Sequence, residues 1–301
     1  MMNSRFFVWI KAARLPSQFY ILIPILLGQM VAFSIYQYFS WDLFLFLLAF
    51  SLFIQFYIIF ANDFADFETD RINKTYTMFS GGSRVLVDGE LSLSAIKMAI
   101  IIAMTLCLVV GFIFTFIFQR HLSLAFVILS FSLLWAYSYK PLQLSYRGGG
   151  ELLQTLGLGL ILPYFGFYIQ SNSLIGLPPL LLCILFPTHL ACAIATSLPD
   201  QPSDKLSAKK TFTVRFGSDF AKATILVLQL ISLVLLWSYF QIGFQNLKME
   251  FLVYLPIIGI LLSLPFFRSN PGETKLSFFV FFSLLTTMAT EIVLILIHYF
   301  G

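Results

Sequence analysis

Residues 42–61 read DLFLFLLAFSLFIQFYIIFA, and an acidic segment, NDFADFETD, follows directly at 62–70. The first segment has the length of about 20 residues that an α-helix needs to cross a bilayer. Its large apolar side chains occupy successive positions rather than alternating with polar ones, so it is apolar on every helical face and does not resemble a strand of a membrane barrel. The sequence therefore predicts a membrane helix that ends in a cluster of carboxylates.

The composition of the whole chain is that of a membrane protein. Of its 301 residues, 59% are hydrophobic and 11% are charged, whereas soluble domains have about a quarter of their residues charged. This composition excludes secreted modules, nucleic-acid binding proteins and disordered chains, and it leaves transporters, channels, receptors, structural subunits and membrane enzymes. Similar apolar segments predict nine membrane helices at about 18–36, 42–61, 93–118, 122–138, 151–170, 174–197, 219–241, 250–267 and 277–300.

The basic residues indicate how these helices are oriented. All but two of the 18 Lys and Arg residues, Arg120 and Lys248, precede the first predicted helix or lie in every second connection after it. Cytoplasmic loops are enriched in Lys and Arg, so we expect the N-terminus to be cytoplasmic. Prolines within several spans favour kinked helices around a central cavity. The expected fold is an all-α membrane protein in which residues 1–301 form a single transmembrane domain, with nine transmembrane helices around that cavity.

The acidic residues gather in two cytoplasmic loops, at about 62–92 and 199–218. Asn62, Asp66 and Asp70 are spaced four residues apart, which places them in one column on a helix, and Asp200 and Asp204 repeat this spacing. Stacked carboxylates repel each other, so a cation is expected between them. Oxygen ligands suit Mg²⁺, which proteins commonly bind through one or two carboxylates together with phosphate and water. These five residues are therefore the predicted magnesium ligands.

Basic residues follow or separate the two acidic loops, which predicts that the metal-bound ligand is a diphosphate. Lys and Arg side chains neutralise phosphate groups and donate hydrogen bonds to them. The predicted diphosphate-binding residues are Arg71, Lys74, Arg84, Lys140, Arg147, Lys209 and Lys210.

The two acidic motifs together resemble those of the UbiA superfamily of intramembrane prenyltransferases. The resemblance rests on NDxxDxxxD at 62–70, DxxxD at 200–204, and Lys-Lys-Thr at 209–211 leading to Val-Arg-Phe-Gly at 214–217. Membership implies a UbiA-like fold of nine transmembrane helices and two Asp-rich motifs that bind Mg²⁺ and an isoprenyl diphosphate. It also implies that Asp66, Asp70, Asp200 and Asp204 are the catalytic residues.

Two further segments look most like the 1,4-dihydroxy-2-naphthoate polyprenyltransferases of menaquinone synthesis. They are SRVLV at 83–87 and YSYKPLQLSYRGGGEL at 137–152. The resemblance implies transfer of a polyprenyl group from an allylic diphosphate to this aromatic acceptor. Tyr137, Tyr139 and Tyr146 are candidates for contact with the acceptor or with the carbocation. We expect the protein in a bacterial inner membrane, with its active site facing the cytoplasm.

Other functions fit parts of the sequence. A UbiA-type enzyme could use 4-hydroxybenzoate, homogentisate or a glycerol phosphate as its acceptor. A cation-coupled transporter would bind its ions near the middle of the bilayer on broken helices, whereas most acidic residues here lie at helix ends and Glu291 alone lies deep within a predicted span. A CDP-alcohol phosphotransferase would carry a DGxxAR element, which the sequence lacks. A non-catalytic scaffold leaves the acidic column unexplained.

Overall fold

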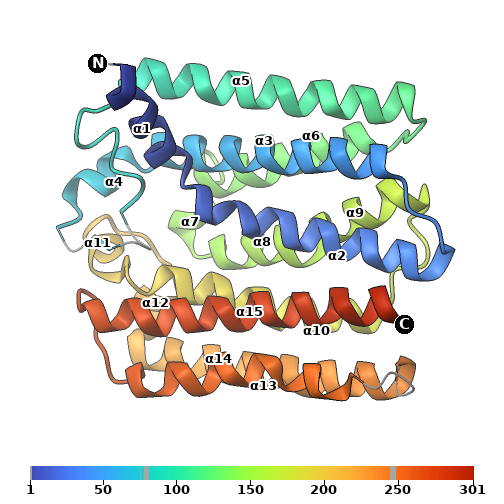
Figure 1. Cartoon of the computed structure of the whole chain (residues 1–301). Helices are drawn as coiled ribbons and strands as arrows, with labels where there is room; N and C mark the ends of the chain where they lie inside the picture. Colours follow the sequence, from blue (N-terminus) through green and yellow to red (C-terminus); the bar gives the residue numbers. More distant parts are fainter. Residues whose placement is uncertain (1, 75, 78–80, 245–248) are drawn as a thin grey trace.

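The computed structural model describes residues 2–74, 76–77, 81–244 and 249–301, and every regular element within them is helical (Figure 1). The α-helices are α1 (Met2–Ala13), α2 (Phe19–Tyr36), α3 (Trp41–Ala65), α4 (Phe67–Ile72), α5 (Leu93–Phe112), α6 (Ser123–Ser138), α7 (Leu144–Arg147), α8 (Gly150–Leu156), α9 (Leu162–Ser171), α10 (Pro179–Ser197), α11 (Gln201–Leu206), α12 (Phe212–Phe216), α13 (Ser218–Gly243), α14 (Leu255–Ser263) and α15 (Thr274–Phe300). Two π-helical turns, η2 (Ile113–Ile117) and η3 (Gly157–Ile161), extend α5 and join α8 to α9. Short 3-10 turns are η1 (Leu15–Gln18), η4 (Glu250–Tyr254) and η5 (Leu264–Phe266).

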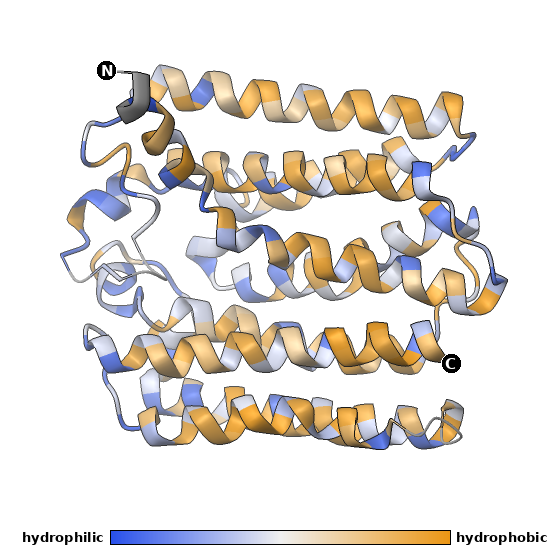
Figure 2. Cartoon of the chain, in the orientation of Figure 1, coloured by the Kyte–Doolittle hydropathy of each residue, from blue (hydrophilic) through white to orange (hydrophobic). Residues whose placement is uncertain are grey.

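The predicted all-α membrane fold is confirmed. Within the described residues, seven helices are long and apolar enough to cross a membrane, and two shorter apolar helices span 123–138 and 250–266. Together these nine helices cover the nine predicted spans. Figure 2 shows hydrophobic residues along the bundle and hydrophilic residues gathered at its two ends. The number of crossings and the cytoplasmic N-terminus are compatible with this arrangement and stay predictions.

The long helices run side by side, and the short helices gather at one end of the bundle (Figure 1). This end, on the left of the view, holds α4, α11 and α12 together with the N-terminus, and the C-terminus lies at the opposite end. Helix α4 contacts α11 directly. The two loops that carry the acidic motifs are thus brought together, although more than 100 residues separate them in the sequence.

Helices α2 and α9 pack closely enough that their glycines contact backbone. A Cβ atom on Gly28 would overlap the carbonyl oxygen of Pro163, and one on Gly166 would overlap the carbonyl oxygen of Ile25. Small residues allow such approach between membrane helices, where van der Waals contact replaces the hydrophobic effect as the main source of association. Helix α2 is the centre of this side of the bundle because it also packs on α15 and α3.

Glu291, the acid deep within a predicted span, is paired inside the bundle. Its Oε1 atom lies 3.2 Å from Nε2 of His189, so the pair joins α15 to α10. Both residues are at most 3% exposed. A buried polar group needs such a partner in a medium without water. The pair therefore links α10 to α15 within the bundle, away from the ends of both helices.

Candidate active site

The first acidic motif lies where α3 meets α4. Helix α3 ends at Ala65, and Asp66 caps it and precedes α4, so the predicted column is interrupted by a bend. The amide N–H of Asp66 still donates to the carbonyl of Asn62 at 2.8 Å, and that of Asp70 donates to Asp66 at 2.8 Å. These bonds retain the four-residue spacing across the bend, so Asn62, Asp66 and Asp70 lie at successive turns.

The second acidic motif forms the start of α11. Asp200 precedes the helix, Pro202 lies in its first turn, and the N–H of Asp204 donates to the carbonyl of Asp200 at 2.8 Å. Proline is tolerated in a first turn because the amide hydrogen that it lacks would have no helical partner there. The helix is therefore compatible with its proline, and its two aspartates lie one turn apart.

Lys209 joins the two motifs. Its Nζ atom lies 3.1 Å from Oδ1 of Asp66 and 3.7 Å from Oδ1 of Asp204, and the residue is 8% exposed. Burial by itself lowers the pKa of the ammonium group, but the Asp66 and Asp204 carboxylates outweigh burial and raise the pKa of Lys209. Lys209 is therefore a permanent cation between the motifs.

The chain around Lys209 is fixed by bonds to α7 and α8. The N–H of Lys210 donates to the carbonyl of Tyr146 at 2.9 Å, and the N–H of Phe212 donates to the carboxylate of Glu151 at 2.6 Å. Thr211 donates to Asp204 at 3.4 Å. The segment directly after Lys209 is thus anchored by three successive residues.

A glycine turn passes between the other two carboxylates of the site. Oδ1 of Asp200 accepts hydrogen bonds from the N–H of Gly81 at 3.0 Å and from the side-chain amide of Asn73 at 3.2 Å. A Cβ atom on Gly82 would overlap Oδ2 of Asp70, and the φ of Gly82 is +68°. Glycine is required at this position by both the space and the backbone conformation.

Three carboxyl groups of the site, those of Asp70, Asp200 and Asp204, hold protons far more readily than free aspartates. Burial and the charges of Asp66 and Asp63 raise the pKa of Asp70 to about 7, despite the opposing charges of Arg14 and Lys209. Burial and Asp204 raise the pKa of Asp200 to about 8. Burial, opposed mainly by Lys209, raises the pKa of Asp204 to about 6. The site therefore gathers more negative charge than its own cations neutralise, which favours a bound cation.

The donor set fits Mg²⁺. All five predicted ligands offer oxygen atoms, and Oδ1 of Asn62 is buried without a hydrogen-bond partner among the described residues. Within the same part of the chain, no three His, Cys, Asp or Glu side chains lie close enough to enclose a metal ion by themselves. Mg²⁺ usually takes few protein ligands and completes its shell with phosphate and water.

The other basic candidates take different positions. Arg84 donates to the backbone carbonyls of Asp70 and Asn73, at 3.0 and 3.4 Å, and so holds the end of α4. Arg71 pairs with Glu68 at 2.8 Å on the exposed surface. The remaining candidates Lys74, Arg147 and Lys210 have exposed side chains at the same end of the bundle.

One of the three candidate tyrosines donates a hydrogen bond to the acidic motif. The hydroxyl of Tyr146 donates to Oδ1 of Asp66 at 3.0 Å, and its ring lies 4.6 Å from Nζ of Lys209. The hydroxyl of Tyr139 donates instead to the backbone carbonyl of Ala61 at 3.0 Å. Tyr137 accepts a hydrogen bond from Ser145 through its backbone carbonyl.

Sequence reasoning missed a second polar cluster beside the site. Asp63 is 4% exposed, and the guanidinium of Arg14 and the hydroxyl of Ser83 both donate to its carboxylate. From the sequence, Arg14 contributed only to the prediction of membrane orientation, and Asp63 lies outside the column of residues spaced four apart. The cluster ties the chain before α2 to the glycine turn.

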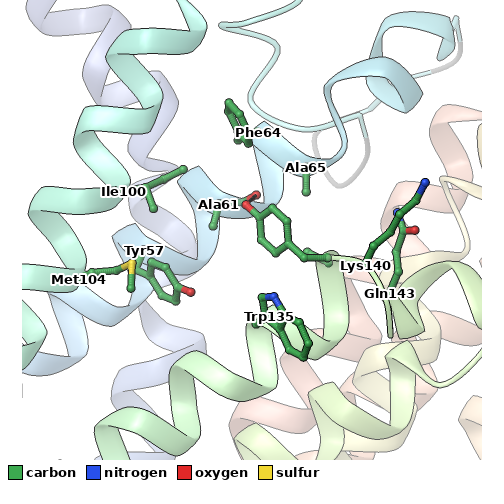
Figure 3. Close-up of a pocket in the computed structure, with 11 residues that line it drawn as sticks. Tyr57, Ala61, Phe64, Ala65, Ile100, Met104, Trp135, Lys140 and Gln143 are labelled. Carbon is green, nitrogen blue, oxygen red and sulfur yellow. Dashed lines mark hydrogen bonds between the residues drawn. The ribbon is translucent and has the colours of Figure 1, made fainter.

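A lateral pocket of about 660 Å³ lies next to the acidic motif, between α3, α5 and α6 (Figure 3). Aromatic and apolar side chains such as Tyr57 and Trp135 line most of it, and Lys140 and Gln143 lie on one side. Lys140, predicted to bind diphosphate, is an exposed residue at the edge of this pocket.

Comparisons with known proteins identify the fold. Over 92% of this chain and 97% of the other, the structure is similar to an apo UbiA homologue from Aeropyrum pernix K1, with a TM-score of 0.69 and 14% identity. A UbiA homologue from Archaeoglobus fulgidus bound to GPP and Mg²⁺ gives 0.66 and 19%, covering 95% and 99% of the two chains. A digeranylgeranylglyceryl phosphate synthase gives 0.65 and 16%, covering 99% of each.

A comparison with the curated proteins finds no match to the sequence. The UbiA prenyltransferase family matches residues 21–285, which include both acidic motifs and Lys209. The chain belongs to the UbiA prenyltransferase family.

Proposed function

We propose that this prenyltransferase carries out the Mg²⁺-dependent transfer of a polyprenyl group from an allylic diphosphate to an aromatic acceptor. The observation that carries the proposal is the meeting of two carboxylate motifs around Lys209 at one end of a membrane bundle. Similar structures from Archaeoglobus fulgidus are bound to GPP or DMAPP with Mg²⁺. Asn62, Asp66, Asp70, Asp200 and Asp204 are the residues that would hold the metal here.

The charges of the site suit a diphosphate that must depart with a pair of electrons. Mg²⁺ held by these residues would neutralise the diphosphate and make it a better leaving group. Lys209 stays protonated, and its ammonium group would be available to donate to a diphosphate oxygen where Asp66 and Asp204 hold a metal ion. Tyr146, which donates to Asp66, keeps that carboxylate oriented.

The reaction needs no nucleophile from the protein. The allylic C–O bond breaks, and both of its electrons leave with the diphosphate. A carbon of the electron-rich ring then forms the new C–C bond with the allylic cation. The ring regains aromaticity by losing either a proton or, where that carbon bears a carboxylate, carbon dioxide.

We further propose 1,4-dihydroxy-2-naphthoate as the acceptor, which places the enzyme in menaquinone synthesis. The segments at 83–87 and 137–152 support this branch, and they lie at the glycine turn and around α7, next to the acidic motifs. We propose that residues 1–301 form a single transmembrane domain in a bacterial inner membrane, with the site facing the cytoplasm.

The test is product formation by purified protein in detergent. The enzyme is incubated with Mg²⁺, a radiolabelled allylic diphosphate and, separately, dihydroxynaphthoate, 4-hydroxybenzoate, homogentisate and a glycerol phosphate. We expect a prenylated product with the naphthoate and none without Mg²⁺. Absence of product with every acceptor contradicts the enzyme assignment, and product with another acceptor alone contradicts the menaquinone assignment.

A further inference from the structure

We propose that Asp63 and Arg14 form a positioning pair for the metal site. The pair holds the glycine turn, residues 81–83, against both acidic motifs and so fixes the carboxylates of Asp70 and Asp200. The proposal rests on the proposed function, because it takes these two carboxylates as metal ligands. It gives Asp63, which belongs to the first motif, a role other than metal binding, and it gives Arg14, which lies outside both motifs, a part in the reaction.

Both oxygens of the Asp63 carboxylate are engaged by protein groups. Oδ1 accepts from the guanidinium of Arg14, and Oδ2 accepts from the amide N–H of Ser83 at 3.3 Å and from the Ser83 hydroxyl. Asp63 is 4% exposed. The preceding Asn62 is the opposite case, because its Oδ1 is buried without a hydrogen-bond partner among the described residues. Successive residues of a helix point about 100° apart, so Asn62 has an oxygen to offer a metal ion, whereas Asp63 acts on its protein neighbours.

The glycine turn connects the pair to both acidic motifs. The N–H of Gly81 donates to Oδ1 of Asp200 at 3.0 Å. A Cβ atom on Gly82 would overlap Oδ2 of Asp70, and it would lie 3.2 Å from each of the two charged groups of the pair. The pair and the Asp70 carboxylate therefore pack on the same glycine. A shift of the turn displaces a hydrogen-bond donor of Asp200 and the packing of Asp70 together, and groups that orient metal ligands in this way set the affinity of the site.

The position of Arg14 is fixed by the chain around it. Its φ is +42°, in the left-handed region that few residues other than glycine adopt. Its carbonyl accepts hydrogen bonds from the N–H and the hydroxyl of Ser17, at 2.8 and 2.7 Å. The Ser17 hydroxyl in turn accepts from the side chain of Gln55 in α3 at 2.9 Å. A strained backbone persists where its surroundings hold it, and such positions gather at functional sites. These bonds tie Arg14 to α3, the helix that carries Asp63.

The binding test is a calorimetric titration of the purified protein in detergent with Mg²⁺ alone. Groups that orient metal ligands contribute about 10- to 100-fold to metal affinity. We expect Arg14→Gln to weaken Mg²⁺ binding about tenfold and Asp63→Asn to do the same. The double variant should lose little more than either single variant, because the pair acts as a unit. Lys11→Gln is the matched control, since it removes an exposed ion pair with Glu90 on the same connection and should leave the affinity unchanged.

The direction of the Arg14→Gln effect separates positioning by Asp63 from metal binding by Asp63. If Asp63 were a ligand, loss of Arg14 would release its Oδ1 atom, and Mg²⁺ would bind more tightly. Tighter or unchanged binding in Arg14→Gln overturns the proposal, and so do additive losses in the double variant. Ser83→Ala keeps both charges and removes one donor to Asp63, so it should weaken Mg²⁺ binding about threefold. Where the Arg14 variant does not fold, an unchanged affinity in Ser83→Ala overturns the proposal.

Kinetics separate failure of the pair from failure of the proposed function. With an acceptor that gives product, Arg14→Gln should raise the Mg²⁺ concentration for half-maximal rate about tenfold, and saturating Mg²⁺ should restore kcat. A kcat that stays low at saturating Mg²⁺ shows that Arg14 acts on the diphosphate itself and overturns the positioning role. If the wild type forms product and Arg14→Gln matches Lys11→Gln, the pair alone fails. If no acceptor gives product, the proposed function fails, and the Mg²⁺ titration decides the role of the pair; absence of Mg²⁺ binding as well overturns both.

Discussion

Replacing Lys209 by Met removes the cation between the two acidic motifs while nearly preserving side-chain length. At an effective dielectric constant of about 20, the separations of 3.1 and 3.7 Å to Asp66 and Asp204 correspond to about 5 and 4 kcal/mol of Coulomb attraction. Desolvation of the buried ammonium group offsets much of this attraction, and breaking buried pairs costs about 3–5 kcal/mol in practice. The carboxylates limit the loss by taking up protons, so we expect the Met variant to be about 3 kcal/mol less stable near neutral pH.

The assay is unfolding of the purified protein in detergent, by denaturant or by heat, measured with and without Mg²⁺. Mg²⁺ should recover much of the lost stability, because it neutralises the same carboxylates, and prenyl transfer should still fall by about 10² to 10³. The adjacent Lys210→Met is the matched control. Its side chain is exposed, so its effect on stability should stay within about 0.5 kcal/mol. Equal effects of the two substitutions would refute the assignment of Lys209 as the buried bridge.

Three further perturbations follow from the same geometry. In the absence of diphosphate, Mg²⁺ affinity should rise between about pH 6 and 8.5. The raised pKa values of Asp70 and Asp200 leave these carboxyl groups protonated at the lower pH, and metal binding must release those protons. Calorimetry in buffers of different ionisation enthalpy measures the proton release, and a pH-independent affinity contradicts the prediction. Gly82→Ala should lower activity by at least tenfold, because the added Cβ meets Asp70 at a positive φ; wild-type rates in this variant would show that the turn can move. Tyr146→Phe, which removes the donor to Asp66, should reduce kcat more than stability, with an unfolding change of about 1 kcal/mol; a stability loss without a rate change would assign Tyr146 a purely structural role.

The helices could be predicted from the sequence because their signal is local. An apolar segment such as 42–61 identifies a span by length and composition alone, and the four-residue spacing of Asn62, Asp66 and Asp70 also depends only on local geometry. The structure modifies the second prediction at one point, since the chain bends at Asp66. Just beyond the bend α4 packs against α11, a contact that no local pattern encodes.

The contacts between distant segments could not be predicted in the same way. Seven basic residues near the acidic loops looked equivalent, yet Lys209 alone of the seven directs its ammonium group at the motif carboxylates, because α7 and α8 anchor its segment. Arg14 looked like a topology marker and instead binds the buried Asp63. Lys140 lies just after α6, at the edge of the lateral pocket. Charge and spacing mark candidates, and tertiary packing selects among them.

The central claim is that both acidic motifs act on one diphosphate, and a double-mutant cycle on diphosphate binding tests it most directly. The Kd of a radiolabelled allylic diphosphate is measured with Mg²⁺ for Asp66→Asn, Asp204→Asn and the double variant, with Glu68→Gln as the exposed control. We expect each single substitution to cost about 2 kcal/mol, roughly 30-fold, and Glu68→Gln to cost little. If the motifs share the ligand, the double variant should lose clearly less than the sum of about 4 kcal/mol. Strictly additive losses, or a loss for Glu68→Gln equal to the others, would contradict a single site built from both motifs.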